Sequence, residues 1–219
     1  GGDRYKGSKS KENARKAATA VFDMAIAKKV DLLLIVGDVF STKETFAEEF
    51  EVAMRGARRA KKAGVQIVWV FASHDDAADR RAQYHELPGK HFYGPELKRK
   101  TVPALDLTLF GYGRGLEDVK EARRTIRNIE GKRTSKYNIA CIHASTKVAT
   151  KSFLKEFPKI QYWALGDRHG KEMVIEKDGC KAVYPDKHVE GKNARPDSVV
   201  VGRIGGDGRV EVGWEKIRI

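Results

Sequence analysis

The chain has 219 residues, of which 41% are hydrophobic, enough to fill one large domain over residues 1–219. Lys and Arg number 43 against 30 Asp and Glu, a formal net charge of +13 that favours polyanionic partners such as nucleic acid. Two cysteines cannot form a disulfide framework, and no apolar run approaches the roughly 20 residues that span a bilayer. The composition therefore predicts a cytoplasmic protein without a membrane partner, although abundant ion pairs are also typical of proteins from hot environments.

The first seventy residues predict alternating helices and strands. Apolar residues recur every three or four positions over residues 11–29 and over Phe46–Lys62, as in amphipathic helices. Residues 30–36 and 65–71 are short apolar runs, which we expect to be strands buried on both faces. The order helix, strand, helix, strand is typical of a parallel sheet.

The middle and the end of the chain predict shorter elements. Prolines and glycines over residues 85–104 predict an irregular loop, and the glycine-rich residues 111–115 predict a flexible turn rather than a dinucleotide-binding loop. We expect strands at 105–110, 137–142 and 162–165, helices at 116–129 and 151–157, and antiparallel hairpins from 173–184 and 198–217.

Four short polar motifs stand where apolar runs end. They are Gly37-Asp38, Ser73-His74-Asp75, His143 and Gly166-Asp167-Arg168-His169. The ends of strands in an α/β sheet are where such folds build their sites. Asp and His are also the residue types that hold metal ions for hydrolysis. Together the motifs predict a functional site, whereas each motif alone is an ordinary turn.

The order of these motifs resembles that of the calcineurin-like metallophosphoesterases, and most of all the DNA-repair nuclease subunits of the SbcD and meiotic-recombination type. Residues 31–40 (DLLLIVGDVF) and 162–169 (YWALGDRH) are similar to two of the family's sequence boxes. The resemblance covers essentially the whole chain. It implies a four-layer α/β/β/α sandwich with mixed sheets and two manganese ions (Mn2+) at the strand ends.

The resemblance also implies roles for individual residues. Asp38 matches the carboxylate that bridges both metal ions, and His143 and His169 match ligands of the second and first ion. His74 matches the histidine that protonates the leaving group or steadies the scissile phosphate. Asp167 and Ser73 replace a His and an Asn of the family boxes, so they are substitute ligands at most.

Other departures weaken the expected site. The family opens with a strand ending in Asp-x-His, and the sequence begins just after the point where that His would come, so the first strand is expected to be missing. Asp186 replaces a glycine of the family. The implied ligand set is therefore degenerate, with fewer than the four ligands that stable metal sites usually have.

Two functions from different classes remain open at this point. The first is a DNA-repair phosphodiesterase or nuclease, which by resemblance pairs with an SMC-like ATPase and can form a homodimer. The second is an inactive scaffold or binding subunit that keeps the fold without its metals. A phosphatase for small phosphoesters is a third reading, which the positive charge disfavours. The nucleic-acid-binding candidates are the basic residues of one helix face, Arg55, Arg58, Arg59, Lys61 and Lys62. Members of the family usually carry a further capping region, which we expect this chain to be without.

Overall fold

The structure is a computed structural model. It describes residues 8–40, 46–72, 75, 80–116, 120, 123–124, 126–127, 135–144, 150–166, 173–185 and 198–217. The helices are α1 (Ser8–Ala27), α2 (Phe46–Lys62), α3 (Arg81–Tyr84), the 3-10 turn η2 (Pro103–Leu105) and α5 (Lys151–Lys155). The strands are β1 (Leu32–Val36), β2 (Gln66–Val70), β3 (Lys90–Phe92), β4 (Gly94–Val102), β5 (Leu107–Leu116), β6 (Tyr137–Ala144), β7 (Tyr162–Gly166), β8 (Met173–Lys177), β9 (Cys180–Tyr184), β10 (Ser198–Ile204) and β11 (Val210–Lys216).

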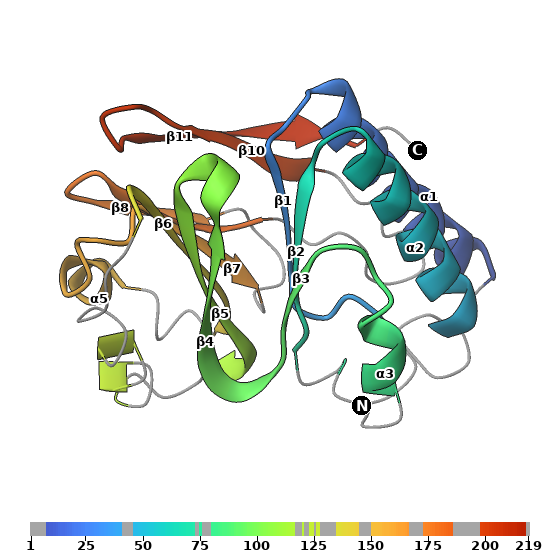
Figure 1. The fold of residues 1–219 in the computed structure, drawn as a ribbon, viewed down its shortest axis with the longest axis horizontal. Helices are drawn as coiled ribbons and strands as arrows, with labels where there is room; N and C mark the ends of the chain where they lie inside the picture. The colour runs from blue at the N-terminus through green and yellow to red at the C-terminus, as the bar shows by residue number, and fades with distance from the viewer. Residues whose placement is uncertain are drawn as a thin grey trace.

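The strands form two main sheets and one hairpin (Figure 1). The smaller sheet has the order β1-β2-β3 and is parallel throughout. The larger sheet has the order β4-β5-β6-β7-β9-β8 and is mixed, because β5, β6, β7 and β9 run parallel while β4 and β8 are antiparallel. Strands β10 and β11 form a separate antiparallel hairpin. The mixed α/β class, the parallel rhythm and both predicted hairpins are thus confirmed.

Three hydrophobic clusters show how the layers pack. One contains Phe22 and Trp69 and joins α1 and α2 to the smaller sheet. A second, with Val68 and Leu109, lies between the two sheets. The third, with Trp163, covers the opposite face of the larger sheet and includes α5. In Figure 1 the two long helices accordingly lie on one side of β1–β3, and α5 lies on the far side of the other sheet.

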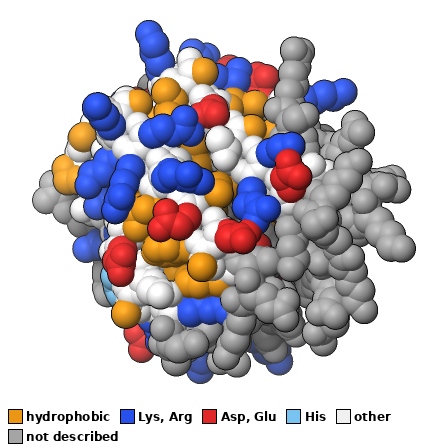
Figure 2. Space-filling view, turned by 90° about the vertical axis from the view of Figure 1, so that its right-hand side faces the viewer, with side chains coloured by type: hydrophobic (Ala, Val, Ile, Leu, Met, Phe, Trp, Pro, Cys, Tyr) orange, Lys and Arg blue, Asp and Glu red, His pale blue; other side chains and the backbone are white. Residues whose placement is uncertain are grey.

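Helix α2 follows directly from its sequence. Its apolar face is buried, its first turn carries Glu48 and Glu49, and its last turn carries basic residues, which suits the helix dipole. Arg59 pairs with Asp23 of α1 at 2.6 Å. Figure 2 shows this helical side of the molecule, where Lys and Arg are interspersed with Asp and Glu.

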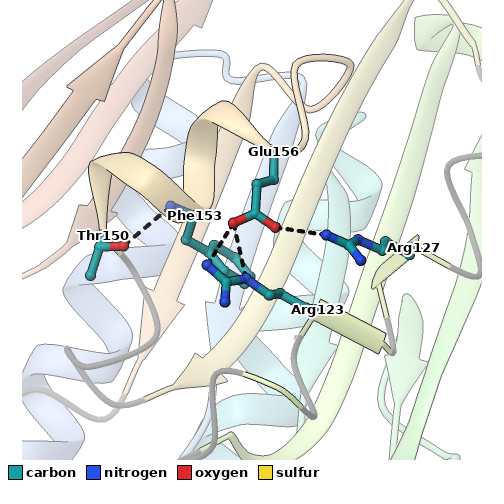
Figure 3. A network of polar contacts seen from close by, with 5 residues as sticks. All are labelled: Arg123, Arg127, Thr150, Phe153 and Glu156. Carbon is teal, nitrogen blue, oxygen red and sulfur yellow. Dashed lines mark hydrogen bonds and ion pairs between the residues drawn. The ribbon is translucent and has the colours of Figure 1, made fainter.

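Helix α5 is held at both of its ends. Thr150 accepts a hydrogen bond from the Phe153 N–H at 3.2 Å, a normal N-cap. Glu156, just after the helix, binds Arg123 through Nε at 2.9 Å and Arg127 through a guanidinium nitrogen at 3.2 Å (Figure 3). Both arginines belong to the predicted helix at 116–129, which is helical at residues 120, 123–124 and 126–127, whereas Leu116 is the last residue of β5. The network ties the two helical segments on this side together.

The prediction of an irregular loop over residues 85–104 was wrong, because β3 and β4 occupy much of it. Pro95 lies within β4, which is the outermost strand of its sheet, and the register shifts between Gly94 and Lys98. Proline is tolerated on an edge strand because its missing N–H leaves no partner unsatisfied. The breaker residues therefore indicated an edge strand rather than the absence of a strand.

The predicted turn at residues 111–115 was also wrong, since β5 continues through them to Leu116. These glycines allow close packing instead. A β-carbon on Gly111 would lie 2.1 Å from the Phe92 ring, and one on Gly113 would lie 2.7 Å from the Phe71 carbonyl.

Strand β1 differs from its prediction in burial. Its five residues are half-buried rather than fully buried, and β1 is an outer strand of the sheet that the described residues form. Cys141 and Cys180 are free and buried, as core thiols would be. Within the described residues no helix is both long and apolar enough to cross a membrane.

Candidate functional site

The carboxyl ends of strands from both main sheets meet at one place. The Gly37 N–H, just after β1, donates to the Val70 carbonyl at the end of β2 at 2.8 Å. In the other sheet His143 of β6 pairs with Gly166 of β7. A β-carbon on Gly166 would lie 2.4 Å from the Val36 carbonyl oxygen, so the ends of β7 and β1 are in close contact. The two sheets therefore converge at their carboxyl edges, as the placement of the motifs predicted.

Asp38 and His143 face each other across this junction. His143 Nε2 lies 3.5 Å from Asp38 Oδ2. The His143 side chain is 4% exposed and the Asp38 side chain 25% exposed, so the imidazole is enclosed while the carboxylate reaches solvent. The two residues are far apart in sequence and come from different sheets, and the tertiary packing alone brings them together.

Two glycines make room for the imidazole. A β-carbon on Gly37 would lie 2.0 Å from His143 Cδ2, and a β-carbon on Gly166 would lie 2.8 Å from the same atom. Gly37 also has a φ of +77°, which residues with a side chain rarely adopt. Larger residues at these two positions would displace the ring of His143.

The backbone at Asp38 is unusual. Asp38 has a φ of +48°, directly after the positive φ of Gly37. A non-glycine residue in this region costs of order 1 kcal/mol and persists where the surroundings enforce it. The conformation turns the chain at the end of β1, where the carboxylate meets His143.

Asp75 is what holds this loop. Its carboxylate accepts hydrogen bonds from the backbone N–H groups of Val39 at 3.2 Å, Phe40 at 2.9 Å and Ala72 at 2.9 Å. The residue is fully buried, and its own carbonyl accepts a hydrogen bond from the Tyr84 hydroxyl at 2.9 Å. Asp75 thus ties the two residues after Asp38 to the end of β2. We call this arrangement the Asp75 clamp.

Two opposing effects act on the acidity of Asp75. Burial raises the pKa of its carboxyl from 3.8 to about 6, and the nearby Asp38 charge acts in the same direction. The hydrogen bonds from Phe40, Ala72 and Val39 favour the carboxylate and lower the pKa, but they do not cancel the effect of burial.

Asp75 belongs to the motif Ser73-His74-Asp75, but the sequence pattern predicts no role for it. A signal was present: Asp at the end of a strand commonly accepts hydrogen bonds from nearby backbone N–H groups. Its actual partners include a loop more than 30 positions away, and this could not be read from the sequence.

The described residues contain part of the predicted site. Asp38 and His143 are brought together, whereas Ser73, His74, Asp167 and His169 lie outside the described residues, as does Asp186. Over the part of the chain that the structure describes, no three His, Cys, Asp or Glu residues are grouped as metal ligands. The five basic candidates, Arg55, Arg58, Arg59, Lys61 and Lys62, are all exposed on α2.

The pair Asp38 and His143 fits a shared divalent cation. Their 3.5 Å separation is longer than the usual range for a hydrogen bond. Ligand bonds of about 2.0–2.2 Å place two ligands of one ion about 3 to 3.5 Å apart. Imidazole and carboxylate are both ligands for manganese or zinc. Asp38 and His143 are therefore compatible with binding a metal ion. Asp75 is not counted as a metal ligand, because its oxygens already accept hydrogen bonds from three backbone N–H groups.

Comparisons with known proteins support the fold alone. No protein-family model and no curated protein matches the sequence. A hypothetical protein from Thermus thermophilus has a similar structure, with a TM-score of 0.56, 12% sequence identity and coverage of 94% of each chain. Another crystal structure has a TM-score of 0.57 and 10% identity, and the match covers 91% of this chain and 93% of that one. The fold is thus shared with solved structures over nearly its full length.

Proposed function

We propose that this chain is a metal-dependent phosphodiesterase of the metallophosphoesterase type that acts on DNA. The observation that carries the proposal is the approach of Asp38 to His143, 3.5 Å apart, at the junction of two sheets. The layering of two helices, two sheets and further helices fits the family's four-layer sandwich. The net charge of +13 supports a polyanionic substrate over a small phosphoester.

Each residue of the site has a distinct task in this proposal. Asp38 and His143 bind a divalent ion of the manganese type. When bound, such an ion neutralises the phosphodiester charge and lowers the pKa of water. His74, by family resemblance, would steady the scissile phosphate or protonate the leaving oxygen. The Asp75 clamp fixes the strained backbone that presents Asp38. By the same resemblance, an SMC-like ATPase is a proposed partner, and a second copy of the chain is a further proposed partner.

Cleavage of labelled single- and double-stranded DNA with and without Mn2+ tests the proposal. We expect cleavage that depends on the metal and falls by about 100-fold or more in an Asp38→Asn variant, because the ion would lose a charged ligand. Asp31→Asn is the matched control, because Asp31 is an exposed carboxylate at the opposite end of β1. Cleavage unaffected by Asp38→Asn would refute the assignment of the site.

A second candidate function is an inactive binding or scaffold subunit. It is favoured because the Asp75 carboxylate already accepts hydrogen bonds from three backbone N–H groups. Among the described residues this leaves the pair Asp38 and His143 as candidate metal ligands, which are few for a stable metal site. This reading predicts DNA or protein binding without cleavage, and no metal in an elemental analysis after exposure to Mn2+. Stoichiometric metal that is lost in the His143→Ala variant would exclude it.

A further inference from the structure

Three lysines lie on β3 and β4, the two strands that the chain joins as it passes from one sheet to the other. Strand β3, with Lys90, is the outermost strand of the smaller sheet, and β4, with Lys98 and Lys100, is the outermost strand of the larger sheet. Only Tyr93 separates the two strands, so the chain crosses directly between the sheets (Figure 1). We call Lys90, Lys98 and Lys100 the crossover lysines.

Strand register places all three side chains on the inner side of the sheets. Lys90 pairs with Val68, and Lys100 pairs with Leu109. Paired residues on neighbouring strands point to the same face. Val68 and Leu109 belong to the core between the sheets, and Lys98 lies two residues from Lys100 on the same strand. The crossover lysines therefore lie along the open edge of this core.

The Phe92 ring forms the floor of the cluster. Phe92 is fully buried, and Lys100 Nζ lies 5.6 Å from the centre of its ring. Lys90 and Lys100 are half-buried, while Lys98 is exposed. The pKa of Lys100 is lowered, first by burial and then by the positive charges of Lys90 and Lys98. The three cations thus repel one another at a partly desolvated place.

The cluster lacks internal compensation. Over the described part of the chain, no ion pair joins a carboxylate to any of the crossover lysines, and the nearby Glu96 lies in the shifted segment of β4. By contrast, Arg59 of α2 pairs with Asp23, and Arg15 of α1 pairs with Glu48. The helical surface is therefore partly neutralised, whereas the crossover lysines concentrate positive charge without a counter-charge.

We propose that the crossover lysines bind the phosphate backbone of a nucleic acid strand. Lys98 and Lys100 are about 6.5–7 Å apart along an extended strand, so they form a row that suits a linear polyanion. Strand β3 is parallel to β1 and two strands away, about 10 Å, so its carboxyl end, at the crossover, lies on the same edge as Asp38. The lysines lie back from this edge, since Lys90 begins β3 and Lys100 is level with Ile139, four residues before His143. A bound backbone a few nucleotides long can reach both places. The choice of nucleic acid as the polyanion rests on the proposed function.

Binding of a fluorescein-labelled oligothymidine of about 20 nucleotides, measured by anisotropy in EDTA over a range of salt concentrations, tests the inference. In the triple variant Lys90→Gln, Lys98→Gln, Lys100→Gln we expect affinity to fall by about tenfold or more at low salt. The slope of log K against log salt should flatten by about 2, since each phosphate contact on a single strand contributes about 0.7. The matched control, Lys159→Gln, Arg209→Gln, Lys216→Gln, removes the same charge from exposed positions outside the cluster and should lose less than about threefold.

Equal losses in the two triple variants would overturn the inference, because net charge alone would then explain binding. Unchanged affinity together with self-association on a sizing column would also overturn it, since the lysines would then only protect an edge strand from pairing.

Failure of this inference can be distinguished from failure of the proposed nuclease function. DNA binding that depends on the crossover lysines but without Mn2+-dependent cleavage would support the inference and refute the nuclease. Cleavage of a small phosphodiester such as bis(p-nitrophenyl) phosphate, with DNA binding unchanged in the lysine variant, would support the enzyme and refute the inference.

Discussion

Replacing Asp75 by Ala tests whether this residue holds the loop that carries Asp38. In the native structure its carboxylate accepts three backbone N–H groups, from Val39, Phe40 and Ala72. The substitution leaves these donors buried without that acceptor. Asp31→Ala, which removes an exposed carboxylate, is the matched control and should leave stability unchanged.

The size of the effect follows from the number of donors. Each buried donor left without a partner costs about 1–3 kcal/mol, and neighbouring losses do not add fully. We therefore expect Asp75→Ala to lower the free energy of unfolding by about 4 kcal/mol. For a chain of this length that corresponds to a decrease in melting temperature of about 8–16 °C.

The loss should also depend on pH in a defined direction. The pKa of the Asp75 carboxyl is raised on folding from 3.8 to about 6. The folded state then binds more protons than the unfolded state between these values, so the contribution of Asp75 to stability is full below about pH 4 and falls as pH rises through about 6. A rise of this size in the pKa corresponds to about 3 kcal/mol of the free energy of unfolding. Asp75→Ala should therefore cost more at about pH 4.5 than at about pH 7.5.

Urea denaturation of the wild-type chain and both variants at about pH 4.5 and about pH 7.5 measures these differences. The comparison between variants cancels the titration of all other groups. A cost below about 1 kcal/mol at both pH values would refute the Asp75 clamp. A cost that grows from the lower to the higher pH would show instead that the three hydrogen bonds outweigh burial and hold the carboxylate in its charged form.

Two further predictions concern packing and charge. Gly111→Ala should lower the free energy of unfolding by about 3 kcal/mol, because its β-carbon would lie 2.1 Å from the buried Phe92 ring. Thermal denaturation measures the effect, with Gly213→Ala as the control because Gly213 has open space around it. Equal melting temperatures of the two variants would contradict the close approach of Gly111 to Phe92. Glu156→Gln should lower the free energy of unfolding by less than about 1 kcal/mol, and the loss should shrink in about 1 M NaCl, because its pairs with Arg123 and Arg127 are partly exposed. Glu211→Gln, which removes the carboxylate of an exposed ion pair with Arg203, is the control. A loss that does not change with salt would show that packing rather than charge is responsible.

The elements that sequence predicted well are those whose periodicity is local. Helix α2 was predicted at its observed bounds because its apolar face, its first-turn acids and its last-turn bases all agree. The two errors at residues 85–104 and 111–115 have one origin. Pro95 and Gly111 both disfavour a strand when judged by local propensity alone. The edge strand tolerates the proline, and the close approach of the Phe92 ring requires the glycine. Both reasons are tertiary, so local propensity could not supply them.

The candidate site has the same division between local and tertiary information. Strand ends at Asp38 and His143 were predictable, because each follows an apolar run, and parallel strands direct their ends to one edge. Their meeting across two sheets depends on Gly37 and Gly166, which leave space for the imidazole. It depends equally on Asp75, which holds the loop from β2. The approach of Asp38 to His143 therefore depends on residues that lie outside the pair, and substitution of Gly37, Gly166 or Asp75 should disrupt it even with both members of the pair in place.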